Sequence, residues 1–223
     1  NKKTGDLLKM VPTEENTVKN DFVSNISLNN KYTFFLNTYG SLYAIDSETM
    51  KIIWFLNLNQ SLDLNPSNLF QGSEIICNNK IIIISSNQFT YFLDVNNGSI
   101  IYKKNFTTSI KPLIINNYFF TISKKNLLIA INLNSGKIIY SYNVNTSIAD
   151  FLKIKEKTAH FKSLMMADDK IFAFLDNSYI LKFDIKGNLI NVEKLPAKIN
   201  TYPIFVKGSL VYLDKKNKIS VIN

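Results

Sequence analysis

Few side chains in this 223-residue chain have types and spacings that could do chemistry. His160 is the only histidine, so a Ser-His-Asp triad or a histidine metal cluster would have to be built around it. No Gly-x-Ser-x-Gly elbow accompanies it, and its neighbours are typical of a surface loop. Cys77 is the only cysteine, which excludes an internal disulfide and a cysteine-based zinc site. We expect His160 to be exposed and Cys77 to be a buried structural thiol.

The acidic residues offer no better candidates for catalysis. Glu14-Glu15 and Asp168-Asp169 are neighbours in sequence, and adjacent side chains in a strand or turn point apart. Asp168-Asp169 also stands where Asn116-Asn117 stands in another part of the chain, and both pairs suit a turn. The seven glycines are too scattered for a phosphate-binding loop. The sequence therefore predicts no catalytic, metal-binding or cofactor-binding residue, no cofactor, and a protein that is not an enzyme.

The formal net charge of +9 arises from 26 basic residues, all of which are lysine. A nucleic-acid surface would ordinarily use arginine for bidentate base contacts, so we expect no nucleic-acid partner. Abundant Asn, Ile and Lys indicate the codon bias of an AT-rich genome and a solvated lysine surface. Attraction to lipid headgroups or to an acidic partner is the alternative. No run of 18 apolar residues predicts a transmembrane segment, and peripheral membrane association remains open.

A short phrase returns along the chain and indicates its fold class. Leu42 to Asp46, followed by Lys51 to Trp54, has weaker copies downstream. The copies align on the Asp or Asn that ends the apolar part, found at Asp46, Asp94, Asn132, Asp184 and Asn223. Asn1 fits the series one repeat earlier, because Gly5 follows it as Gly98 follows Asp94. The chain therefore holds five repeats averaging about 44 residues, the pattern of an array of one small unit.

Each repeat contains four short apolar runs separated by polar turns. In the third repeat the runs are 112–115, 118–122, 127–131 and 137–142, which predicts consecutive antiparallel hairpins. Four strands in each repeat predict an all-β chain, a β-propeller of four-stranded blades forming a single domain over 1–223. A linear solenoid is the alternative. Residues 202–222 supply only three strands, so a strand at 5–10 is expected to complete that blade and close the ring.

Two irregular segments interrupt the repeat, at 59–71 and 143–162. Insertions in repeat arrays gather on one face and often bind partners, so these segments are the predicted interaction sites. The candidate partner-binding residues are Ile148, Phe151, Leu152, Leu69 and Phe70. The alternative is that these segments tuck their own apolar side chains onto the blades and need no partner. An exposed apolar strip would favour binding.

The segment from Leu42 to Trp54 resembles the repeat of PQQ-like β-propellers, in which an aliphatic-Tyr-Ala-Leu-Asp phrase precedes Thr-Gly-Lys and a terminal Trp. This copy keeps Tyr43, Ala44, Asp46 and Trp54, but Met50 stands where the family has glycine. The resemblance covers the whole chain and implies the propeller fold. It implies little about function, because members of the family do different things.

Within that family, the chain resembles the outer-membrane protein assembly factor BamB, a scaffold without a cofactor. This resemblance implies a periplasmic or outer-membrane-associated protein that binds a component of the assembly machinery. BamB has eight blades, so the five repeats here are either part of a larger propeller or a closed ring of five. Quinoprotein dehydrogenases are the alternative branch and imply an enzyme or cofactor-binding module. They need a tryptophan floor, calcium and an acidic base, whereas this chain has one tryptophan.

Overall fold

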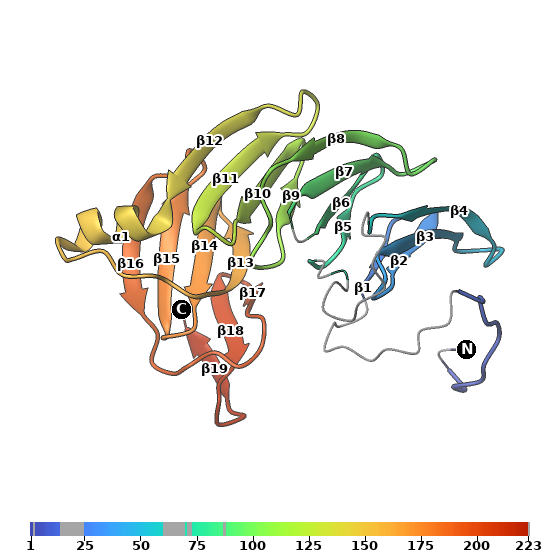
Figure 1. Cartoon of the computed structure of the whole chain (residues 1–223). Coiled ribbons are helices and arrows are strands. Elements are labelled where there is room, and N and C mark those ends of the chain that lie inside the picture. Colours follow the sequence, from blue (N-terminus) through green and yellow to red (C-terminus); the bar gives the residue numbers. More distant parts are fainter. Residues whose placement is uncertain (2, 14–24, 60–69, 71–72, 87, 223) are drawn as a thin grey trace. The chain divides into compact units, whose positions relative to one another are not determined.

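The computed structural model describes residues 1, 3–13, 25–59, 70, 73–86 and 88–222 (Figure 1). These residues form five antiparallel sheets of three or four strands, each with its strands in sequence order. The chain divides into two compact units, unit 1 (Asn1–Thr107) and unit 2 (Thr108–Asn223). The predicted all-β, propeller-like class is confirmed. The single domain and the closed ring remain predictions.

Unit 1 contains two four-stranded sheets. The first consists of β1 (Asn25–Leu28), β2 (Tyr32–Leu36), β3 (Ser41–Asp46) and β4 (Ile52–Asn57). The second consists of β5 (Ile76–Cys77), β6 (Ile81–Ser85), β7 (Thr90–Asp94) and β8 (Ile100–Lys104).

Unit 2 contains two four-stranded sheets, one three-stranded sheet and one helix. The first sheet consists of β9 (Leu113–Ile115), β10 (Tyr118–Ile122), β11 (Leu127–Asn132) and β12 (Ile138–Asn143). Helix α1 (Val144–Leu152) follows, and the next sheet consists of β13 (Phe161–Ala167), β14 (Lys170–Leu175), β15 (Tyr179–Asp184) and β16 (Leu189–Lys194). The last sheet consists of β17 (Ile204–Val206), β18 (Ser209–Leu213) and β19 (Ile219–Ile222).

The repeat seen in the sequence is also a repeat of backbone geometry. In every four-stranded sheet the register between the third and fourth strands shifts just before the recurring Asp or Asn, as between Ala44 and Ile45. That residue then accepts backbone hydrogen bonds in an Asx turn, for example from Thr49 to Asp46 Oδ1 at 2.7 Å. The N-terminal residues repeat the turn, because Gly5 N donates to Asn1 O at 2.8 Å. The recurring Asp or Asn therefore ends β3, β7 and β11 in an Asx turn.

Burial follows the position of a strand within its sheet. All five residues of β6 are buried, as expected for an apolar run covered on both faces. The fourth strands differ, since Ile52 and Ile53 of β4 and Ile138 and Ile139 of β12 are exposed. The outer strand of each blade therefore presents apolar side chains that the core does not use.

Adjacent sheets of a unit meet through an aromatic side chain and a glycine. In unit 1, the Trp54 indole of β4 donates to Val95 O at 3.0 Å in the turn after β7. Gly98 in that turn has φ +71°, and a Cβ there would lie 2.7 Å from Trp54 Cε3. In unit 2, Tyr140 of β12 lies against Gly187, where a Cβ would lie 2.6 Å from Tyr140 Cε2. Glycine is thus needed both for the left-handed backbone and for the close approach of the ring.

Three features differ from what the sequence predicts. Residues 5–10 form no strand in this structure, although a strand was expected there, and their pairing with the C-terminal sheet remains a prediction. The segment after Asn143 contains the helix α1, where no regular element was expected. Cys77 is half-buried, with its Sγ 3.2 Å from Ser27 Oγ and 3.4 Å from Leu28 O, so its predicted full burial is wrong.

Met50 has φ +56°, close to the values of the glycines at the same place in other repeats. The methionine therefore holds the left-handed conformation that glycine holds in the other repeats, at a steric cost. Asp168 and Asp169, with φ +47° and +56°, form the turn between β13 and β14, as expected.

Candidate functional site

Among the described residues, the side chains that could act as catalysts do not come together. His160 is exposed, and its backbone carbonyl accepts a hydrogen bond from Asp176 N at 3.0 Å. Among the residues that the structure describes, no group of three His, Cys, Asp or Glu side chains could hold a metal ion. Glu14 and Glu15 lie outside the described residues. In the described part, the candidate functional surface is instead that of α1, where exposed apolar side chains lie beside a groove.

Helix α1 begins and ends at well-defined caps. The side chain of Asn143 accepts from Asn145 N at 2.9 Å and Thr146 N at 3.4 Å, as an N-cap should. Lys153 ends the helix in the left-handed conformation, with φ +53°. These caps hold a nine-residue helix whose sequence, rich in β-branched and small polar residues, has weak intrinsic helix propensity.

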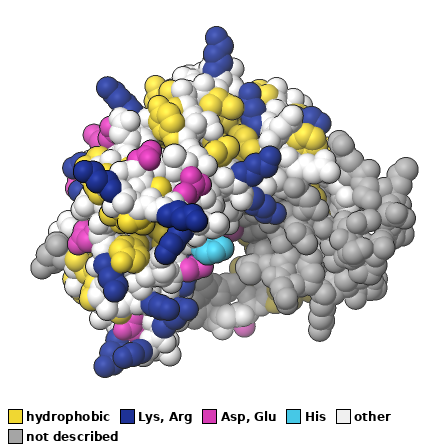
Figure 2. All heavy atoms as spheres, turned by 60° about the vertical axis from the view of Figure 1, so that its left-hand side comes forward, with side chains coloured by type: hydrophobic (Ala, Val, Ile, Leu, Met, Phe, Trp, Pro, Cys, Tyr) yellow, Lys and Arg dark blue, Asp and Glu magenta, His cyan; other side chains and the backbone are white. Residues whose placement is uncertain are grey.

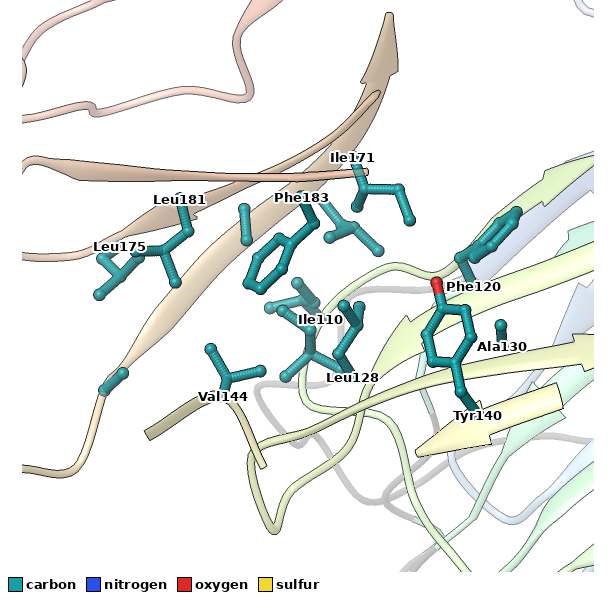
Figure 3. Close-up of a cluster of buried hydrophobic side chains, with 14 residues drawn as sticks. Ile110, Phe120, Leu128, Ala130, Tyr140, Val144, Ile171, Leu175, Leu181 and Phe183 are labelled. Carbon is teal, nitrogen blue, oxygen red and sulfur yellow. The ribbon is translucent and has the colours of Figure 1, made fainter. Parts of the chain in front are cut away.

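The inner side of α1 is anchored in the core of unit 2. Val144 is fully buried among Leu128, Leu175 and Phe183, between the sheets β9–β12 and β13–β16 (Figure 3). Ile148, one helical turn later, is partly buried and packs against the same cluster. Ile148 was a candidate for partner binding, and the structure places it against the core.

The chain after α1 returns along the helix. Ala159 N donates to Asn145 Oδ1 at 2.9 Å, and Asn126 Nδ2 donates to Ala159 O at 3.0 Å. Nearer the middle, Thr146 Oγ1 donates to Glu156 Oε2 at 3.1 Å. We define the α1 insert as residues 143–160, comprising the helix, its caps and this returning segment. These hydrogen bonds hold the insert at both ends, so the backbone that carries its exposed side chains is held in place.

The C-terminal end of α1 and the residues just after it carry unburied apolar side chains. Phe151 is 44 % exposed, Leu152 41 % and Ile154 51 %. Two of the predicted partner-binding residues, Phe151 and Leu152, therefore lie together on the surface. Leu69 lies outside the described residues. Phe70 is only 3 % exposed and packs in the core of unit 1 beside Gly40, so it does not lie on a binding surface.

A shallow groove of about 530 Å³ runs beside the helix. Its apolar lining consists of Tyr142, Phe151 and Leu189, and its polar lining includes Ser147, Asp150 and Asn188. Tyr142 stacks on Tyr140 with ring centroids 5.1 Å apart and an interplanar angle of 8°. Gly187 also lines the groove, because the turn before β16 lies against those two rings. The groove is thus built on the junction between two sheets, a rigid part of unit 2.

Several polar groups around the groove already have partners. Asn188 donates from its backbone and side-chain nitrogens to the Asp184 carboxylate, both at 2.8 Å. Partial burial tends to raise the pKa of Asp184, but these hydrogen bonds and Lys186 lower it, and the net shift is downward. Ser147 Oγ donates to Asn143 O at 2.9 Å. Asp150 is exposed, and the described residues give its carboxylate no hydrogen bond or ion pair.

The sequence identified this segment by its break in the repeat, but it did not indicate the groove. Tyr142 and Leu189 are terminal-strand residues of two different repeats, and neither stood out among similar residues. The spacing of Val144, Ile148 and Leu152 at intervals of four is the signal that could have revealed α1. Figure 2 shows the surface on this side of the molecule, where apolar side chains lie among lysine and acidic ones.

Comparison with known proteins gives structural likeness only. No protein-family model and no curated protein sequence matches the chain. BamB from Moraxella catarrhalis superposes with a TM-score of 0.56 at 9 % identity, over 88 % of this chain and 68 % of that one. The computationally designed protein Ika8 gives 0.65 at 12 % identity, over 88 % of this chain and 57 % of that one.

Among the described residues, no helix is long and apolar enough to cross a membrane. At such low identity the structural neighbours carry no residue-level correspondence. What this chain shares with known proteins is a propeller-like all-β fold with BamB among its structural neighbours.

Proposed function

We propose that this protein is a non-catalytic scaffold that binds another protein through the exposed apolar side chains of the α1 insert. The observation that carries the proposal is the pair Phe151 and Leu152, both more than two-fifths exposed at the C-terminal end of a helix whose earlier residues Val144 and Ile148 are held in the core. Apolar side chains on a capped helix anchored in this way lose little conformational freedom when a partner covers them. Phe151 also lines a groove together with Tyr142, and aromatic residues are enriched where proteins bind one another.

The setting we propose is the periplasm, in association with the outer membrane and the assembly of its β-barrel proteins. The likeness to BamB supports this setting at the level of the fold. The partner would then be a component of the assembly machinery. Peripheral contact with the membrane is compatible with this setting.

The proposal can be tested with a photoreactive amino acid placed at Leu152 in the full-length protein in its native host. We expect a specific adduct with one protein, identified by mass spectrometry, which weakens when Phe151→Ala is also present. The matched control carries the same group at Ile219, an exposed apolar residue of β19. Circular dichroism should show that Phe151→Ala leaves folding unchanged, because its side chain is largely outside the core.

Two results would contradict the proposal. Identical adducts from positions 152 and 219 would mean that the probe reports random encounters. Purified protein that carries quinone absorbance, or whose properties depend on calcium, would favour a quinoprotein-type enzyme or cofactor-binding module instead.

A further inference from the structure

The net positive charge is confined to one of the two units. Unit 2 contains seventeen lysines and eight acidic residues, so it carries the whole formal net charge of +9. Unit 1 contains nine lysines and nine acidic residues, and is therefore neutral. A charge asymmetry of this size creates a long-range potential that steers anionic partners toward unit 2.

Within unit 2, the α1 insert combines this charge with its exposed apolar side chains. Lys153, Lys155 and Lys157 are exposed, and no described residue gives their side chains a hydrogen bond or ion pair. Glu156 points toward the helix, since it accepts from Thr146. Lys155 and Lys157 lie on either side of Glu156 in the sequence, and both are exposed. Their charges therefore lie on the surface of the insert.

The groove beside α1 has the opposite local character. Its only charged lining residue is Asp150, and its walls are Tyr142, Phe151 and Leu189. A carboxylate of the partner would be repelled there, whereas an apolar side chain would cover the two rings and Leu189. Apolar groups of a partner are therefore favoured in the groove, and acidic groups are favoured beside Lys155 and Lys157.

Building on the proposed function, we propose that the α1 insert binds an acidic protein segment in extended form. One apolar side chain of the segment lies between Tyr142, Phe151 and Leu189. Its carboxylates lie against Lys155 and Lys157. Exposed ion pairs contribute little each, so the apolar contact supplies most of the affinity and the lysines supply orientation and a fast, salt-dependent association.

The probe is a fluorescein-labelled peptide of repeating Glu-Phe-Glu-Ser, titrated into the full chain and followed by fluorescence anisotropy. We expect binding that weakens as salt is added, because exposed charges are screened. Lys155→Glu with Lys157→Glu should weaken it by about tenfold. The matched control is Lys124→Glu with Lys125→Glu, which changes the net charge equally at an exposed turn between β10 and β11. It should change the affinity by no more than about twofold.

Other probes separate the alternatives. A Lys-Phe-Lys-Ser peptide that binds as tightly would overturn the proposal, as would equal effects of the two lysine pairs. Vesicles of phosphatidylcholine with phosphatidylglycerol that bind in place of the acidic peptide would assign the surface to lipid instead.

Failure here and failure of the proposed function can be told apart. If the acidic peptide does not bind but the adduct from position 152 forms and depends on Phe151, the scaffold function stands and the acidic partner is wrong. If neither occurs, both are wrong.

Discussion

Replacing Gly187 by alanine tests how closely two sheets of unit 2 depend on the approach of Tyr140. The backbone there has φ +87°, and a left-handed conformation costs an L-residue about 1–2 kcal/mol. The new Cβ would also lie 2.6 Å from Tyr140 Cε2 and 2.9 Å from Tyr142 Cδ2, so both rings would have to move. Overpacking of this kind costs about 1–3 kcal/mol. The free energy of unfolding should therefore fall by about 2–5 kcal/mol.

Gly208 provides a matched control in the same unit. Its φ of +85° is nearly the same, but a Cβ there meets no atom within 4 Å. Gly208→Ala should therefore lower the free energy of unfolding only by the cost of the left-handed backbone, about 1–2 kcal/mol. The difference between the two variants, about 1–3 kcal/mol, isolates the contact with the rings and corresponds to a Tm lower by about 2–12 °C.

Urea unfolding followed by circular dichroism measures both variants. Equal losses of stability in Gly187→Ala and Gly208→Ala would refute the reasoning, because they would mean that the rings of Tyr140 and Tyr142 move aside without loss of free energy. A double-mutant cycle in unit 1 repeats the test independently. Gly98→Ala should lose most of its excess cost in a Trp54→Leu background, since the ring that the Cβ meets is gone.

Four further outcomes follow from single residues. Met50→Gly should raise the stability by about 0.5–1 kcal/mol in urea unfolding, because glycine holds φ +56° without the left-handed strain. Tyr140→Phe should raise it by about 1 kcal/mol, because the buried Tyr140 hydroxyl has no hydrogen-bond partner among the described residues; a loss would reveal a partner. Burial raises the pKa of Tyr102 to about 12, so its neutral form stabilises the fold fully below pH 10 and less as the pH approaches 12. Ultraviolet titration between pH 9 and 11 measures how many tyrosines lose their proton. Tyr102→Phe should leave that number unchanged in the folded protein and lower it by one in the urea-unfolded protein. Burial also raises the pKa of the Cys77 thiol, so alkylation by iodoacetamide at pH 8 should be slower in the folded than in the unfolded protein; equal rates would contradict this.

The repeat, the strands and the turns could be predicted because they depend on residues close in sequence. The runs of the third repeat became β9 to β12 almost residue for residue, and Asp168-Asp169 became a turn. These features follow from hairpin periodicity and from the few residue types that enter left-handed conformations. Met50 stands where the PQQ-like repeat has glycine, and the structure gives it the left-handed backbone that glycine holds in the other repeats of this chain.

The candidate site could be predicted only in part, because it depends on contacts distant in sequence. Its segment was found from the break in the repeat, but α1 was missed because β-branched residues at Val144, Thr146 and Ile148 lower helix propensity. Asn143 and the anchoring of Val144 compensate for that weakness. Phe151 and Phe70 looked alike in sequence. Only the packing shows that one is exposed and the other buried.

The junction between an aromatic ring and a glycine also limits how such a chain can be lengthened by duplication. A copied blade can follow the strand of Trp54 or Tyr140 only if its own turn offers a glycine like Gly98 or Gly187. The blade that carries Met50 offers a side chain instead, and a preceding tryptophan or tyrosine would collide with it. A blade with glycine in this turn can therefore follow a blade that ends in tryptophan or tyrosine. The blade with Met50 can follow only a blade with a smaller side chain at that position. Blade-swapped chains, assembled with and without Met50→Gly, would show this restriction as a difference in the yield of folded protein.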